Sequence, residues 1–79
     1  MNSNWKYAGT AIENKEFKID GINVWDYQWQ MIDKKVAVKD PQYGNLYSFS
    51  IYEIKVNDLK IYFVAGEFSN MVWGFYTQT

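Results

Sequence analysis

The 79-residue chain contains no Cys, no His and no Arg, and these absences exclude much of the chemistry that proteins perform. Without Cys there are no disulfides or thiolate metal sites, and without His the commonest general base and metal ligand is missing. All eight positive side chains are Lys and the net charge is −1, which argues against recognition of nucleic acids or phosphorylated ligands. The length predicts a single domain, residues 1–79, with residues 1–3 frayed.

Aromatic residues stand out, because four Trp, seven Tyr and five Phe make up 20% of the chain. Large rings allow a short chain to build a core from few side chains, so we expect most of them to be buried. A binding site lined by rings is the alternative. No segment of ten residues has helical periodicity, which predicts little or no helix.

The first predicted elements are an edge strand and a hairpin. Residues 4–12 alternate, with Trp5, Tyr7, Gly9 and Ala11 on one face, which is typical of a strand. After a turn at residues 13–15, Asp20-Gly21 between EFKI and INVW is the strongest hairpin signal in the chain. The predicted pairs are Ile19 with Ile22 and Phe17 with Val24, leaving Lys18 and Asn23 pointing outward.

A second hairpin is predicted to follow. The apolar residues shift by one position after Val24, which indicates a bulge or bend at residues 24–26. Residues 25–31 then alternate as a strand. We expect a turn at Asp33-Lys34 that pairs Met31 with Val36 and Trp29 with Val38. Residues 40–45, which contain Asp-Pro and Gly-Asn, are predicted to form a loop.

Residues 46–77 are predicted to form three strands joined by two-residue turns at Asn57-Asp58 and Ser69-Asn70, each of type I′ with positive φ at both central residues. The first turn places Ile54 opposite Ile61 and Ser50 opposite Ala65. The second turn gives the pairs Phe63–Tyr76, Ala65–Gly74, Gly66–Trp73 and Glu67–Val72.

Both faces of this three-stranded ribbon are apolar, but polar residues interrupt them at opposite ends. Glu53, Lys55 and Lys60 lie on one face near the first turn, whereas Ser48 and Glu67 lie on the other face near the second turn. A strongly coiled sheet explains this pattern, because the inward-looking face then changes along each strand. A sheet covered on both faces, with a partner chain as one cover, is the alternative.

These elements predict an all-β fold: a small antiparallel meander of six or seven short strands that closes into a barrel or roll of SH3-like size. No catalytic, cofactor-binding or metal-binding residue is assigned, and we do not expect an enzyme. Four of the nine carboxylates fall in predicted turns, where Asp is favoured for backbone reasons. Asp26 and Glu67 could form a carboxylate pair, but nothing in their spacing requires one.

One end of the predicted meander is a candidate interaction patch. The loop at residues 40–45 and the turn at residues 69–70 should lie together there, and aromatic residues and Met are enriched in the centres of interfaces. The alternative is that these rings cap the core. The candidate patch consists of Tyr43, Tyr47, Glu67, Phe68, Met71 and Trp73.

The predicted function is a small non-enzymatic protein-interaction module that contacts a protein partner or a second copy of itself. The alternative is a small-ligand or carbohydrate-binding domain that uses exposed Trp and Tyr, and such a site should be a concave pocket with converging polar groups. No nucleic-acid partner is expected, for the charge reasons given above. No membrane partner is expected either, because no apolar stretch approaches the roughly 18 residues of a membrane span. The N-terminal residues lack a secretory signal, so we expect a cytoplasmic protein, although a mature secreted form would look similar.

Overall fold

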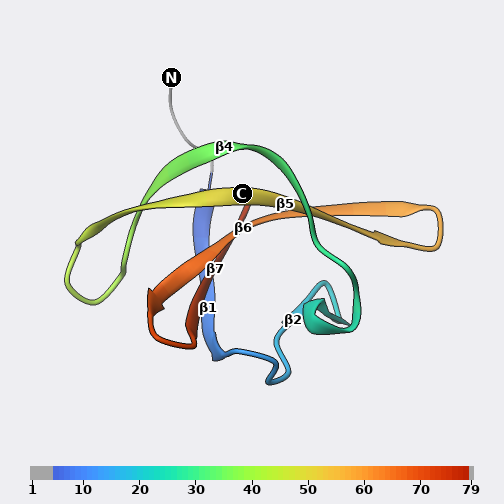
Figure 1. The fold of residues 1–79 in the computed structure, drawn as a ribbon, viewed down its shortest axis with the longest axis horizontal. Coiled ribbons are helices and arrows are strands. Elements are labelled where there is room, and N and C mark those ends of the chain that lie inside the picture. Colours follow the sequence, from blue (N-terminus) through green and yellow to red (C-terminus); the bar gives the residue numbers. More distant parts are fainter. Residues whose placement is uncertain (1–4, 79) are drawn as a thin grey trace.

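The computed structural model describes residues 5–78, the side chain of Lys34 excepted, and it is an all-β structure (Figure 1). Five strands form one antiparallel sheet in the order β1-β7-β6-β5-β4, and β2 and β3 form a separate two-stranded ladder. The predicted fraying of residues 1–3 lies outside the described residues. The elements are β1 (Trp5–Ile12), β2 (Lys18–Ile19), β3 (Ile22–Asn23), the 3₁₀ turn η1 (Val24–Asp26), β4 (Gln30–Lys39), β5 (Leu46–Val56), β6 (Leu59–Ser69) and β7 (Val72–Gln78).

The predicted all-β class is confirmed, and η1 is the only helical turn within residues 5–78. Closure into a barrel is not observed there, because the sheet ends at β1 on one side and at β4 on the other. The predicted edge strand is confirmed as β1 over residues 5–12, and residue 4 lies outside the described residues. A bulge between Tyr7 and Gly9 divides its predicted apolar face, so that Trp5 and Ala11 pack into different clusters.

The β2–β3 hairpin has the predicted turn. Asp20 and Gly21 both have left-handed backbone angles, with φ of 54° and 79°, as a type I′ turn requires. Ile19 pairs with Ile22 as predicted, and the amide of Val24 donates a hydrogen bond to the carbonyl of Phe17 at 3.0 Å. The predicted bend at residues 24–26 is confirmed as η1.

Asn23 was expected to point outward, but its side chain has a structural role. Its Oδ1 accepts hydrogen bonds from the amides of Phe17, at 3.1 Å, and of Trp25, at 3.3 Å. Asn23 therefore caps η1 and holds the two ends of the hairpin together, as an N-cap side chain does.

The predicted hairpin at Asp33-Lys34 is wrong. The chain continues through these residues without a turn as β4, which pairs with β5 along its length. The register shifts between Met31 and Asp33 and again between Asp33 and Lys35. Bulges absorb the extra residues, so the chain need not turn. The strand predicted at residues 25–31 is wrong for residues 25–29, which form the end of η1 and an irregular segment; residues 30 and 31 belong to β4. Pairing with the 11-residue β5 offers many more ladder hydrogen bonds than a short local hairpin would.

The predicted β5–β6 register is confirmed, with Val56 opposite Leu59, Ile54 opposite Ile61 and Ser50 opposite Ala65. The turn type differs from the prediction. Asn57 has a φ of 58°, but Asp58 does not take a positive φ, whereas a type I′ turn needs both.

The predicted β6–β7 register is wrong by one position. Ala65 lies opposite Phe75, Gly66 opposite Gly74, and Glu67 opposite Trp73, and the register shifts at Phe68. The turn is made by Asn70 and Met71, with a φ of 63° at Met71, and not by Ser69 and Asn70. Because side chains alternate along a strand, this single step moves every residue of β7 to the opposite face of the sheet.

Two separate hydrophobic clusters result, one on each face of the sheet. In β5, residues 52, 54 and 56 pack into the first cluster and residues 47, 49 and 51 into the second. The inward-looking face therefore changes along the strand, as the sequence pattern predicts. The buried residues of the first cluster are Ile19, Val24, Ile54, Phe63, Ala65 and Phe75; those of the second are Val38, Phe49, Val64 and Tyr76.

Each cluster is covered from within the chain. The segment at residues 17–29 covers the first cluster with Phe17, Trp25 and Trp29. The sheet curls over the second, so that the hydroxyl of Tyr76 on β7 donates a hydrogen bond to the carbonyl of Lys39 at the end of β4, at 2.6 Å. The covering segment and the loop at residues 40–45 lie at different ends of the molecule (Figure 1). Two apolar faces are thus buried without a partner chain.

Candidate functional site

The six residues of the candidate patch do not form one surface. Tyr43, Tyr47 and Phe68 line the same groove, as predicted for this end of the meander. Trp73 lies on the opposite face, because the register of β7 is shifted. Its indole contacts those of Trp25 and Trp29, and its Nε1 donates a hydrogen bond to Oε1 of Glu13 at 3.0 Å. Trp73 therefore belongs to the core.

The last two patch residues, Glu67 and Met71, lie at the β6–β7 turn. Both are exposed, and Oε2 of Glu67 accepts a hydrogen bond from the amide of Met71 at 3.0 Å. Met71 is 47% exposed. The exposed Ile12 lies nearby, because it pairs with Val72, the residue that follows Met71. Glu67 thus reaches water at a strand end and closes the turn.

The groove that contains Tyr43, Tyr47 and Phe68 is named the tyrosine groove, and its volume is about 250 Å³. Its remaining wall comes from β1 and β7, which lie beside the 40–45 loop because the sheet is curled. Sequence reasoning missed Tyr7 and Thr10, since no local pattern shows that β1 pairs with the last strand. The lining residues are Tyr7, Thr10, Asp40, Pro41, Gln42, Tyr43, Tyr47, Phe68 and Val72.

Asp40 fixes the conformation of the loop beside this groove. Its Oδ1 accepts hydrogen bonds from the amides of Tyr43, at 2.7 Å, and Gln42, at 2.8 Å, and its Oδ2 accepts one from Asn45 at 3.2 Å. The hydrogen bond from Tyr43 is the main reason why the pKa of Asp40 is lowered, and burial partly opposes it. The carboxylate therefore accepts hydrogen bonds from the backbone of the loop, and it fixes the backbone at Tyr43.

Tyr76 lies beneath the groove and is buried. Its ring meets that of Tyr7 edge to face, with the ring centres 5.6 Å apart. Burial raises the pKa of Tyr76 to about 12, and the negative charge of Asp40 adds to the increase. Its hydroxyl is therefore a structural donor at neutral pH.

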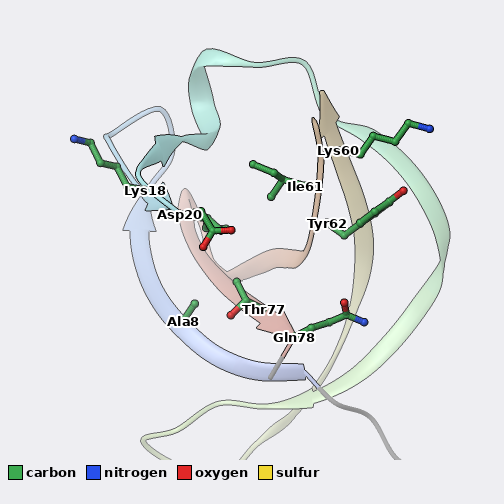
Figure 2. Close-up of a pocket in the computed structure, with 9 residues that line it drawn as sticks. Ala8, Lys18, Asp20, Lys60, Ile61, Tyr62, Thr77 and Gln78 are labelled. Atoms are coloured by element: carbon green, nitrogen blue, oxygen red, sulfur yellow. The ribbon is translucent and has the colours of Figure 1, made fainter. Parts of the chain in front are cut away.

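A second hollow, of about 470 Å³, lies between the β2–β3 hairpin, the start of β6 and the end of β7. Figure 2 shows Ile61, the carboxylate of Asp20 and the hydroxyl of Thr77 among the groups around it. The ammonium groups of Lys18 and Lys60 point away from it, and Lys18 pairs with Glu16 at 3.4 Å. These groups can bind by hydrogen bonding, but they do not form a nucleophile and base pair.

A third hollow, of about 520 Å³, is lined by Gln28, Trp29, Gln30, Glu53 and Lys55. It is named the Glu53 cavity. Glu53 is buried, with 7% of its surface exposed, and its Oε2 lies 4.0 Å from Nζ of Lys60. A hydrogen bond to Glu53 raises the pKa of Tyr62, its ladder partner on β6. The sequence pattern placed Glu53 among polar residues but did not predict its burial.

Most aromatic rings belong to the core. All four Trp side chains are half-buried, and the five Phe side chains are buried or half-buried. Tyr43 is the most exposed of the large apolar side chains of residues 5–78, at 75%. The indoles of Trp25 and Trp29 stack with ring centres 4.8 Å apart, and Phe17 stacks on Phe75 at 4.3 Å. The exposed rings are therefore Tyr rings, and Tyr43 is the most prominent.

Within residues 5–78, no helix is long and apolar enough to cross a membrane. No family model, no curated protein and no solved structure matches this chain.

Proposed function

We propose that this protein is a non-catalytic protein-interaction module that contacts a partner polypeptide, or a second copy of itself, through the tyrosine groove. The exposure of Tyr43 carries this proposal, because a large apolar side chain with 75% exposure projects from a loop whose backbone Asp40 fixes. A loop whose backbone is already fixed loses less conformational entropy on binding than a mobile one. Tyr is also among the residues that dominate binding energy at interfaces.

The size of the groove supports a polypeptide partner. Its volume of about 250 Å³ lies below the roughly 300–1,000 Å³ of typical small-molecule sites, and it suits one or two anchoring side chains. Leu46, which follows the loop directly, is 70% exposed, and it extends the exposed apolar area beyond the groove. A carbohydrate binder that relies on exposed Trp has less support, because all four Trp side chains are half-buried.

We also infer that the curled sheet works as a roll. The groove has walls from β1 and from the loop after β4, which are the two ends of the sheet, and the hydrogen bond from Tyr76 to Lys39 links β7 to β4. In this proposal, contacts between side chains, and not hydrogen bonds between strands, bring the edge strands β1 and β4 together.

A peptide-display selection tests the function. Random peptides are selected on the immobilised full chain, and the affinities of the selected peptides are measured for Tyr43→Ala and for Tyr27→Ala, an exposed Tyr that does not line the groove. We expect Tyr43→Ala to weaken binding about tenfold or more and Tyr27→Ala to leave it unchanged.

Self-association is tested by sedimentation over a range of concentrations. If the groove joins two copies, Tyr43→Asp combined with Met71→Asp should abolish any concentration-dependent increase in the sedimentation coefficient. Peptide binding and self-association that both persist unchanged in these variants would contradict the proposal.

A further inference from the structure

The Glu53 cavity lies where the start of β4 meets the end of β5. Gln30 and Glu53 are ladder partners, so their side chains lie side by side on one face of the sheet. Lys55 follows two residues after Glu53 and therefore lies on the same face. Gln28 and Trp29 complete the lining, and the volume of about 520 Å³ lies within the range of small-molecule sites.

Glu53 has acceptor capacity that the protein does not use. A carboxylate offers about four lone-pair positions, and Glu53 lines the cavity, where such positions are open to a ligand. The interaction with Glu53 raises the pKa of the Tyr62 hydroxyl, whereas Nζ of Lys60, at 4.0 Å, lies beyond hydrogen-bonding distance of the carboxylate. A donor from within the cavity would satisfy the remaining lone pairs.

Charges of both signs surround the cavity, so a ligand of either charge meets repulsion as well as attraction. Lys55 lines it and Lys60 lies next to Glu53, so a cationic ligand meets two positive charges. An anionic ligand meets the carboxylate of Glu53 in a buried setting, where like-charge repulsion is poorly screened. The two Gln side chains each offer both donors and acceptors. A ligand that donates and accepts at several atoms without net charge fits all of these groups.

The geometry points to a second binding site in this protein: the Glu53 cavity binds a neutral polyhydroxylated small molecule, such as a sugar unit. Its hydroxyl groups donate to Glu53 and accept from Lys55 and from the amides of Gln28 and Gln30. Recognition comes from polar groups and not from ring stacking, because one face of Trp29 is covered by Trp25 and its Nε1 donates to the carbonyl of Val24 at 2.8 Å.

An NMR titration tests the proposal. The ¹⁵N-labelled full chain is titrated with glucose, galactose and N-acetylglucosamine up to about 100 mM, a range that detects millimolar affinity. We expect saturable shifts of the side-chain amide signals of Gln28 and Gln30 and of the indole signal of Trp29. Glucosamine and glucuronate, which carry a positive and a negative charge, should bind at least threefold more weakly than the neutral sugars.

Two variants identify the groups responsible. Glu53→Gln keeps the shape of the side chain but removes its charge, and Gln30→Ala truncates an exposed side chain. Each should weaken binding at least fivefold. Glu16→Gln, at an exposed carboxylate outside the cavity, and Tyr43→Ala, in the tyrosine groove, should leave the affinity unchanged.

Several results would overturn the proposal: no saturable shift at Gln28 and Gln30 with any neutral sugar, tighter binding of a charged analogue, or affinities that Gln30→Ala leaves unchanged. Gln30→Ala keeps the test decisive if Glu53→Gln fails to fold. The Tyr43→Ala control separates this site from the tyrosine groove, so either can fail without the other.

Discussion

Two glycines in the central strands mark places where a ring lies directly on the backbone. Gly66 and Gly74 are ladder partners, and the rings of Phe49 and Phe68 occupy the space that their β-carbons would need. The sequence pattern predicted instead that Trp73 covers Gly66, which is wrong because β7 is shifted by one residue. A bare backbone position under an aromatic ring is a known way of packing a sheet tightly.

Gly66→Ala should lower the free energy of unfolding by about 1–3 kcal/mol, because the new methyl group overlaps the buried ring of Phe49. Urea denaturation measures the change. Ser48→Ala, at an exposed position of β5, is the control and should stay within about 0.5 kcal/mol of the unmodified protein. Equal stability of the Gly66 variant and the unmodified protein would mean that Phe49 does not cover Gly66.

Asp40 predicts a loss of stability in acid. Its pKa in the folded protein is lowered from the ordinary value of 3.8, mainly by the amide of Tyr43. Its stabilising contribution is therefore present above pH 3.8 and is lost as the pH falls through the lowered pKa. We expect the unmodified protein to exceed Asp40→Asn in unfolding free energy at pH 7, with a difference that shrinks in acid. A difference that does not depend on pH, measured by chemical denaturation, would refute this role.

At the scale of elements, turns decide which strands pair and in which register. The β6–β7 turn places Met71, with a φ of 63°, in a conformation that costs a residue with a side chain about 1–2 kcal/mol. The bulge at Phe68 accompanies this turn and shifts the register of β7. A residue with no evident turn preference thus sets which face Phe75 and Tyr76 occupy.

Met71→Asn should raise the free energy of unfolding by about 0.5–1 kcal/mol, since Asn tolerates the left-handed region and the Met side chain is half-exposed. Ser69→Gly is the matched control and should destabilise the protein, because Ser69 is a strand residue in the observed register. If the turn were formed by Ser69 and Asn70, the two variants would show the opposite pattern in urea denaturation.

At the scale of the whole molecule, the curl of the sheet brings together elements that are distant in the chain. The hydrogen bond from Tyr76 to the carbonyl of Lys39 crosses from β7 to β4 over two intervening strands. The same curl buries the second cluster and forms the tyrosine groove between β1 and the 40–45 loop.

Tyr76→Phe should cost about 1–2 kcal/mol of unfolding free energy, because the carbonyl of Lys39 loses its donor. The pKa of Tyr76 is raised from 10 to about 12, so the contribution of its protonated form is complete below pH 10 and is lost as the pH rises through about 12. Denaturation in that pH range should therefore show a decline for the unmodified protein that Tyr76→Phe lacks. Tyr27→Phe, at an exposed ring, should match the unmodified protein throughout.

Local chemistry by itself determined the all-β class, the Asp20-Gly21 hairpin with its type I′ turn, and the β5–β6 register. These features depend on neighbouring residues, since a tight turn fixes the pairing of the strands that it joins. Polar residues interrupt the two apolar faces of the central strands at opposite ends, at Glu53 on one face and at Glu67 on the other. This pattern correctly predicted that the buried face changes along these strands.

Only the tertiary structure decided the continuous course of β4 without a turn, the offset of β7 and the pairing of β1 with the last strand. In each case a short local pairing competes with a long ladder to a distant strand. The difference in free energy between the two comes from contacts between residues that are far apart in the sequence. The candidate sites depend on those choices. Tyr7 lines the tyrosine groove, and Trp73 packs in the core instead of in the predicted patch. Glu53 is buried. All three placements depend on the curl of the sheet, which brings together residues that no local pattern connects.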